Sequence, residues 1–519
     1  MVIKRMRNAG AAAILMLTLS GCSPSPEPGS AIPWGGPESL SATPSTGTHY
    51  AQTPWATVHR DSSNSDYVPL NPSTNVAVKW TALEGAALFV GPVMGPEGNL
   101  YVPSGRGTGT SHLHAFNAGG ELLWQTPAMQ SMDDFDYAAV VCAPIVDREG
   151  NVYAADANQL WSFTSRGELR WVTKLNEFGV EGFFITPIFS REGFVGGVST
   201  DGKLALFDRS SGALAIPVLE LPGVSGPPSQ PAPPGLWSGM LAEEFILPLW
   251  DLIFGREIEV ANTPAVHPEI GRIYITAAGD TPTSGVLYGI DTSPDGASIA
   301  FSTPMGAGSG TSPAISPNGR YVYAIDDGGM MVAIDSYSGE VAWQVPDTMG
   351  QASPSIGPDG TLYSFNGIEG AIVAIDGSDG SLKWRRQYND IAEQHLRWIP
   401  FLPRVATIDG LITVTDNGIW TFIDLNYQIR GGEQGFPQPR KIIVAQLDAN
   451  NGEVLGWFES RDASGAFVIP DSDGSLYLTL SGTPTSISYF GVNDKLPGFL
   501  RSELKPQGGL VALEVIGQP

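Results

Sequence analysis

The chain has 519 residues, of which 63 are glycine and 42 are proline, and it carries a formal net charge of −25. That charge disfavours nucleic acid and anionic membrane surfaces as partners, because both would repel it. The high glycine and proline content suits one large all-β repeat domain better than several α/β domains.

Residues 1–21 have the pattern of a secretory signal peptide. Three basic residues precede an apolar run, Ala11 to Leu19, that is too short to span a bilayer. The run ends in Leu-Ser-Gly-Cys, which resembles the lipobox of bacterial lipoproteins, in which the cysteine is acylated. We therefore predict lipidation of Cys22, with a plain signal peptide as the alternative. Ser23 follows the cysteine, which in such lipoproteins indicates sorting to the outer membrane.

Residues 22–50 are predicted to be a disordered tether that holds the folded body, residues 51–519, away from the membrane. They are rich in Pro, Ser, Gly and Thr and contain few apolar side chains. Removal of the signal peptide takes away three basic residues, so the net charge of −25 becomes −28 in the mature chain. If Cys22 is lipidated, Cys142 is the one remaining thiol, and no intramolecular disulfide is expected.

A repeated unit fills the folded body, and its clearest copy is residues 312–343. In this copy, β-prone runs such as Tyr321 to Ile325 alternate with turns such as Asp327 to Gly329. The pattern predicts four antiparallel strands joined by short turns. A sheet of this kind buries both of its faces only by stacking against other sheets like it.

Weaker copies of the unit recur to the end of the chain, which gives eight in all. The last copy, which includes Asp473 and Leu510 to Glu514, stops without a fourth strand, whereas Val76 to Trp80 forms a fourth-strand pattern that precedes the first copy. We predict an all-β fold, an eight-bladed β-propeller of four-stranded antiparallel blades, closed by this N-terminal strand completing the C-terminal blade. Most copies close on a tryptophan, and we assign this position to Trp80, Trp124, Trp171, Trp343, Trp384 and Trp457.

The repeat, P-x4-[DEN]-G-x-[LV]-Y followed by L-x-A-[IF]-[DN] and G-x-[LV]-x-W, resembles that of the pyrroloquinoline-quinone-like (quinoprotein dehydrogenase-like) β-propeller family. The resemblance covers residues 55–516, and Trp55 with His59, Arg60 and Asp61 resembles the N-terminal motif of the family. It implies that the repeated tryptophans dock neighbouring blades. It also implies two functional classes: quinone-dependent dehydrogenases, and cofactor-free scaffolds that include a lipoprotein of the outer-membrane β-barrel assembly machinery.

The first class requires features that the sequence does not offer. A dehydrogenase must hold a tricarboxylate quinone with cationic and aromatic side chains, and usually Ca²⁺ with side-chain oxygens. The chain has no Cys-Cys pair, which many family dehydrogenases carry over the cofactor, and no placeable calcium cluster. We predict no catalytic residue, no metal and no cofactor, in a monomeric, lipid-anchored scaffold that binds outer-membrane or other envelope proteins from the periplasmic side. A PQQ-dependent periplasmic oxidoreductase that acts on alcohols or sugars, with PQQ and Ca²⁺, is the alternative.

Long insertions are expected on one rim of the propeller, which we call the insertion rim. In a meander, the second-to-third turns and the connections between blades lie on one rim, and the other turns lie on the opposite rim. The long segments all belong to the first kind, and they are 128–141, 217–262, 385–401, 416–441 and 480–508. Loops on a rigid scaffold commonly carry binding, so this rim is the predicted functional face.

Two of these segments contain candidate binding residues. Within 217–262, the apolar stretch 236–254 either forms an interface with a partner or a membrane or packs on the propeller. Its candidate partner-binding residues are Trp237, Leu241, Phe245, Trp250 and Phe254. The segment 385–401 concentrates positive charge in an acidic protein, and either binds an anion or another ligand or pairs across the rim with Asp133, Asp134 and Asp136. Its candidate residues are Arg385, Arg386, His395, Arg397 and Trp398.

Overall fold

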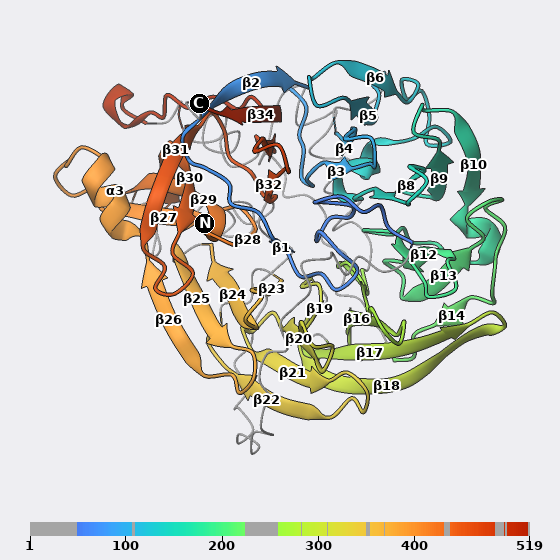
Figure 1. Ribbon diagram of the computed structural model, residues 1–519. Helices are drawn as coiled ribbons and strands as arrows, with labels where there is room; N and C mark the ends of the chain where they lie inside the picture. Colours follow the sequence, from blue (N-terminus) through green and yellow to red (C-terminus); the bar gives the residue numbers. More distant parts are fainter. Residues whose placement is uncertain are drawn as a thin grey trace.

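A computed structural model shows eight β-sheets arranged around one central axis (Figure 1). The predicted eight-bladed propeller is therefore confirmed. The structure describes residues 49–105, 109–223, 258–281, 283–308, 310–348, 353–367, 369–429, 436–482, 493 and 496–516.

Blades one to six are four-stranded meanders that run from an inner to an outer strand. Blade one comprises β3 (Val93–Met94), β4 (Leu100–Pro103), β5 (Leu113–Phe116) and β6 (Leu122–Gln125). Blade two comprises β7 (Ile145–Val146), β8 (Val152–Ala155), β9 (Gln159–Phe163) and β10 (Leu169–Lys174). Blade three comprises β11 (Ile188–Phe189), β12 (Val195–Val198), β13 (Lys203–Phe207) and β14 (Leu219–Glu220).

The next three blades continue the pattern. Blade four comprises β15 (Ala265–Val266), β16 (Ile273–Ala278), β17 (Ser284–Ser293) and β18 (Gly296–Gly306). Blade five comprises β19 (Ala314–Ile315), β20 (Tyr321–Ile325), β21 (Met331–Asp335) and β22 (Val341–Val345). Blade six comprises β23 (Ser355–Ile356), β24 (Thr361–Asn366), β25 (Ala371–Asp376) and β26 (Leu382–Gln387). The short helical elements are η1 (Tyr137–Val141), η2 (Leu175–Phe178), α3 (Asn389–His395) and η6 (Gly498–Leu500).

Blade seven differs from the predicted arrangement. Its meander is β28 (Thr413–Thr415), β29 (Gly418–Ile429), β30 (Phe436–Leu447) and β31 (Val454–Ser460), and β27 (Arg404–Ile408) pairs with the far half of β29. The prediction that 416–441 is an insertion was therefore wrong, because most of it lies in two long paired strands. Residues 418–427 are all buried, so apolar burial on both faces sustains this longer hairpin.

The ring closes as predicted. Strand β2 (Val76–Ala82) pairs antiparallel with β34 (Gly509–Val515), in a sheet that also contains β33 (Leu476–Leu480) and β32 (Val468–Pro470). One strand from the N-terminal part of the chain and three from its C-terminal part therefore form one blade, and the first and last blades share no open edge.

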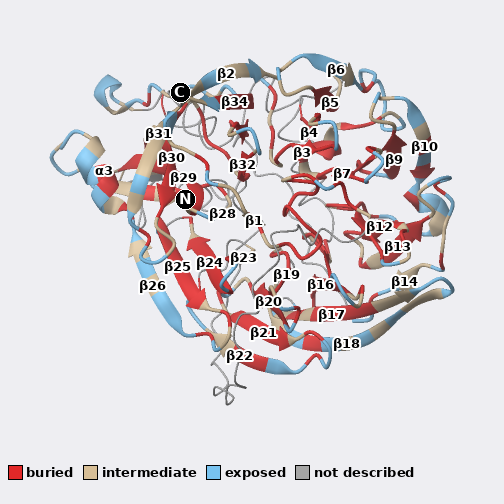
Figure 2. Ribbon diagram, in the orientation of Figure 1, coloured by how far each residue is buried: buried red, intermediate tan, exposed pale blue. Residues whose placement is uncertain are grey.

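Apolar contacts between neighbouring blades form the core. Figure 2 shows that the middle strands are buried, whereas the outer strands contain intermediate and exposed residues. Each outer strand meets solvent on its outward face. A repeated tryptophan docks on the third-to-fourth turn of the next blade, as the family resemblance implies. For example, Trp343 donates its indole N–H to the Gly377 carbonyl, and a Cβ added at Gly380 would lie 2.7 Å from the Trp343 ring. The same indole bond is made by Trp80, Trp124, Trp171 and Trp384.

The N-terminal segment, residues 50–68, crosses the middle of the ring (Figure 1), and we call it the central plug. Residues 55–64 are all buried. Tyr50, which we expected in the tether, is 2% exposed, so the folded body begins slightly earlier than predicted. The plug ends in β1 (Tyr67–Val68), which pairs parallel with β28.

The plug satisfies the innermost backbone donors of the ring. In seven blades, the second residue of the inner strand donates its N–H to the plug; in blade three the donor is Phe189 and the acceptor is the Tyr50 hydroxyl, at 3.3 Å. The other six bonds, to plug carbonyls, are Met94 to Trp55 (2.6 Å), Val146 to Ala56 (3.2 Å), Val266 to Ser62 (2.6 Å), Ile315 to Ser63 (2.9 Å), Ile356 to Ser65 (2.9 Å) and Val414 to Asp66 (2.9 Å). Buried amides rarely go unpaired, so the plug completes the sheets that surround it.

The first prediction concerns ring closure. A chain ending at Gly508 lacks β34, which pairs with both β2 and β33, and so it loses several fully buried apolar side chains such as Leu510 and Ala512. We expect it to be unfolded, or to melt at least about 10 °C below the wild type, as followed by circular dichroism. A chain ending at Ile516 keeps the whole of β34 and serves as the control. Equal melting of both truncations would contradict the closure.

Candidate functional site

The connection between blades six and seven carries the predicted positive segment on the insertion rim. After β26 the chain forms α3, which lies at the outer edge of the ring beside β27 (Figure 1). Ile391 and Ala392 are buried on the inner side of α3. Tyr388, just before the helix, is fully buried and donates its hydroxyl to the Gly452 carbonyl at 3.0 Å. These contacts fix the helix against blade seven.

The candidate arginines pair with carboxylates of their own neighbourhood. Arg385 lies 2.9 Å from Glu369, and Arg386 lies 3.1 Å from Asp390 one helical turn away. The carboxylates that we considered as partners across the rim are engaged elsewhere: Asp133 pairs with Lys174, Asp134 accepts the backbone N–H groups of residues 130 and 131, and Asp136 caps η1. The proposed pairing across the rim was therefore wrong.

A pocket of about 650 Å³ lies between α3 and the outer strand β31. Among the candidate residues, Arg386 and His395 line it. The pocket is also lined by Thr74, Asp390, Gln394, Glu453 and Trp457. The His395 ring stands edge-on to Trp457, with 4.9 Å between the ring centroids, and Lys441 Nζ lies 5.4 Å from the centroid of the same indole. The pocket therefore combines the Trp457 indole and the His395 imidazole with side chains of both charges.

Trp457 is not the blade-docking tryptophan that we predicted. In blades one, two, five and six the docking tryptophan follows a turn glycine by four residues, whereas Trp457 follows Gly452 by five. In β31 the docking position, just after the bulge, belongs to Gly456, which pairs with Gln446 as Trp384 pairs with Ala374. Because successive residues of a strand point to opposite faces, Trp457 faces α3 instead of blade eight.

The ring closure explains why a glycine, and not a tryptophan, stands at the docking position of β31. Blade eight takes its outer strand from the N-terminal part of the chain, so it has no third-to-fourth turn to receive a tryptophan. Thr74, which precedes β2, occupies the space instead, and a Cβ added at Gly456 would lie 2.5 Å from its Oγ1. The shifted tryptophan and the pocket were missed, although the spacing from Gly452 to Trp457 is visible in the sequence.

The other candidate residues of this segment lie outside the pocket. Trp398 is 66% exposed, and Phe401, which we did not single out, is 96% exposed. Arg397 is also exposed, and its carbonyl accepts the hydroxyl of Tyr427. Phe401 has a φ of 65°, a left-handed conformation that is unusual for a bulky residue. This tip presents two aromatic rings to solvent on the predicted functional face.

Several predicted sites lie outside the described residues. These are Cys22 with the signal peptide and most of the tether, and the apolar candidates Trp237, Leu241, Phe245, Trp250 and Phe254. Within the described part of the chain, no helix is long and apolar enough to cross a membrane.

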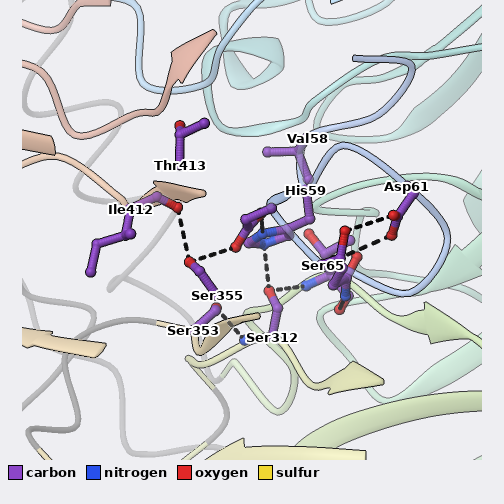
Figure 3. A network of polar contacts seen from close by, with 12 residues as sticks. Val58, His59, Asp61, Ser65, Ser312, Ser353, Ser355, Ile412 and Thr413 are labelled. Atoms are coloured by element: carbon purple, nitrogen blue, oxygen red, sulfur yellow. Dashed lines mark hydrogen bonds and ion pairs between the residues drawn. The ribbon is translucent and has the colours of Figure 1, made fainter. Parts of the chain in front are cut away.

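The residues on the central axis show whether a quinone with Ca²⁺ would fit there. The axis of a propeller is the channel that all blades surround, and here it contains the plug. His59 Nδ1 lies 2.8 Å from Asp66 Oδ1, and His59 Nε2 lies 3.1 Å from the Ser312 hydroxyl. Figure 3 shows His59 beside Ser312 and Ser355, which come from blades five and six. Burial raises the pKa of Asp66, and the neighbouring His59 partly opposes this.

The one guanidinium of the plug pairs with a carboxylate through Nη1, while its buried Nε has no partner among the described residues. Arg60 lies 2.6 Å from Asp61, and both side chains are buried. Asp61 also accepts the backbone N–H of Ser63 and the hydroxyl of Ser65. Among the described residues, no group of three or more His, Cys, Asp or Glu side chains is arranged to hold a metal ion. The axis therefore does not fit a tricarboxylate quinone with its cation.

Three pairs of buried or half-buried carboxylates lie toward the insertion rim, most of them at turns and connections, with Asp424 within β29. They are Asp136 with Asp156, Asp326 with Asp327, and Asp409 with Asp424. Burial raises the pKa of Asp136 and of Asp409 to about 6. Burial, together with the charge of Asp326, raises the pKa of Asp327 to about 7. These groups bind protons in the folded protein at a pH where they would be ionised in the unfolded chain.

Residues 250–488 match the sequence family described as "Outer membrane protein assembly factor BamB". The match agrees with two features of the structure, the eight blades and the repeated tryptophan docking. Residues 250–488 therefore carry PQQ-like β-propeller repeats. No curated protein sequence matches it.

Several solved structures have a fold similar to that of this propeller. It is similar to "Europium-containing methanol dehydrogenase", with a TM-score of 0.56 and 13% identity over 89% of this chain and 98% of the other. It is also similar to quinohemoprotein alcohol dehydrogenase from Comamonas testosteroni, with a TM-score of 0.54 and 12% identity over 90% and 81%. BamB from Moraxella catarrhalis gives a TM-score of 0.46 and 12% identity over 84% and 98%. At these identities the two dehydrogenases show a shared fold and nothing about activity.

The second prediction concerns pH. The pKa values of Asp136, Asp327 and Asp409 are raised by folding, so their stabilising contribution is complete below about pH 4 and is lost as pH rises through about 6 to 7. We expect the melting temperature to fall between about pH 5 and pH 8. Carboxylates whose pKa is lowered, such as Asp201 and Asp359, act in the opposite sense only below about pH 4.

The acidic net charge would also lower stability as pH rises, so a variant must separate the two causes. Asp327→Asn removes a half-buried titrating group whose pKa is raised, whereas Asp295→Asn removes the same charge from an exposed turn. We expect Asp327→Asn to reduce the dependence of the melting temperature on pH and Asp295→Asn to leave it nearly unchanged. Equal slopes in the two variants would show that the Asp327 carboxylate is not responsible.

Proposed function

We propose that this propeller is a lipid-anchored, non-enzymatic binding scaffold of the cell envelope that takes part in outer-membrane protein assembly. Cys22 would carry the lipid, and the tether would place the body in the periplasm, beneath the outer membrane. The observation that carries the proposal is the central plug, because the chain itself fills the axis that a quinone enzyme would need for its cofactor. The family match over residues 250–488 supports the role in assembly.

The insertion rim is the proposed binding face. The tip that contains Trp398 and Phe401 exposes two large rings, and aromatic side chains are typical anchors of protein interfaces. The backbone behind the tip is held by the bond of Tyr427 to the Arg397 carbonyl and by Arg404, whose guanidinium donates to the carbonyls of Glu393 and Leu396. A fixed loop loses little conformational freedom on binding, which favours recognition of an envelope protein here.

The test is a cellular one with matched variants. In a strain that lacks the native gene, wild-type protein should sediment with the outer membrane and restore normal levels of outer-membrane β-barrel proteins. Cys22→Ala should leave the membrane fraction. The double variant Trp398→Ala, Phe401→Ala should stay anchored but lose restoration and lose cross-links to assembly proteins. Asp295→Ala, an exposed change away from this tip, is the control.

Two results would overturn the proposal. One is unchanged β-barrel protein levels in the deletion strain and unchanged cross-links in the tip variant. The other is enzyme activity: purified protein that gains thermal stability with PQQ and Ca²⁺ and then reduces a dye with alcohols or sugars would be a quinone-dependent oxidoreductase.

A further inference from the structure

The pocket between α3 and β31 has a composition that points to one class of ligand. Its aromatic ring, Trp457, is displaced from the blade interface by the glycine at the docking position. The five docking tryptophans donate their indole N–H to a carbonyl of the next blade. Trp457 makes no such bond to any residue of the described ranges, and its ring lines the pocket. The pocket therefore offers an indole with an available donor.

Most of the charged side chains around the pocket lie in short ion pairs. Arg386 lies 3.1 Å from Asp390, and Lys441, beside the indole, lies 2.6 Å from Glu459. Glu453, an exposed residue, adds a further carboxylate to the wall. An anion entering the pocket would meet Asp390 and Glu453, and a cation would meet Arg386. The arrangement consequently favours a ligand without net charge.

The hydrogen-bonding groups that line the pocket include both donors and acceptors. Arg386 and the Trp457 indole donate, Asp390 and Glu453 accept, and Gln394 does both. A ligand that uses them all needs many groups that can donate and accept, which is the property of hydroxyls. It also needs an apolar surface to cover the indole. A sugar ring combines a C–H face with a rim of hydroxyls, and a pocket of about 650 Å³ is within the size range of small-ligand sites.

We infer that the pocket between α3 and β31 binds a neutral oligosaccharide, with Trp457 as the platform and Arg386, Asp390, Gln394 and Glu453 as hydroxyl-binding residues. The site lies at the outer edge of the propeller, separate from the exposed tip around Trp398, and it does not depend on the partner proposed above. Because the pocket is open and polar, the affinity is expected in the millimolar range.

Ligand-observed NMR with the purified protein tests this inference. The probes are three neutral trisaccharides, maltotriose, cellotriose and triacetylchitotriose, with trigalacturonate and triglucosamine as the anionic and cationic comparisons. At least one neutral probe should bind saturably at concentrations up to about 10 mM, and both charged probes should bind about tenfold more weakly or not at all. Trp457→Ala should lower the affinity for the bound probe by at least about tenfold.

The controls separate loss of the site from loss of the fold. Trp398→Ala removes an exposed tryptophan outside the pocket and should bind like wild type. Glu453→Gln keeps the shape of an exposed side chain and should also weaken binding, which covers the case in which Trp457→Ala melts early. The inference is overturned if no neutral probe binds, if a charged probe binds as well as the neutral ones, or if both pocket variants bind like wild type. None of these results bears on β-barrel assembly in cells.

Discussion

The structure depends on the backbone bonds between the inner strands and the central plug. Each inner strand is only two or three residues long, and in seven blades the N–H of its second residue faces the central plug. A single polar segment satisfies seven of these donors in turn, so it links blades that never touch one another. Left-handed backbone at Arg60, Asn64 and Asp66 bends the segment to follow the axis. The ring is therefore held at its centre as well as at its closing blade.

This arrangement also determines where the propeller can act. With the axis occupied, binding is left to the periphery, where the described residues form the exposed aromatic tip and, separately, the pocket between α3 and β31. The pocket is itself a consequence of ring closure. Because blade eight borrows β2, no turn is present to receive a tryptophan from blade seven, and Thr74 with Gly456 fills that interface. Trp457 is consequently free to face α3.

Much of the fold could be predicted because it is periodic. The turn glycines, the tryptophans and the orphan strand Val76 to Trp80 define eight blades and their closure without any structure. The plug could not be derived in the same way. The run His59 to Asp66 is polar and has no strand pattern, and its partners come from blades that are up to about 350 residues away, such as Val414. Blade seven was misjudged because long strands interrupted by polar residues, such as Asp424 and Asn426, resemble a loop.

Hydrogen exchange of the plug tests the central claim most directly. If residues 55–66 complete the inner strands, their amides and those of Met94, Val146, Ile315 and Ile356 should exchange slowly and as one cooperative unit, with protection close to that of the β20–β21 hairpin. Asp66→Ala, which removes the partner of His59, should lower the protection of all of them together. A plug that exchanges within seconds while the inner strands stay protected would be a loosely attached arm, and the account of the ring given above would be wrong.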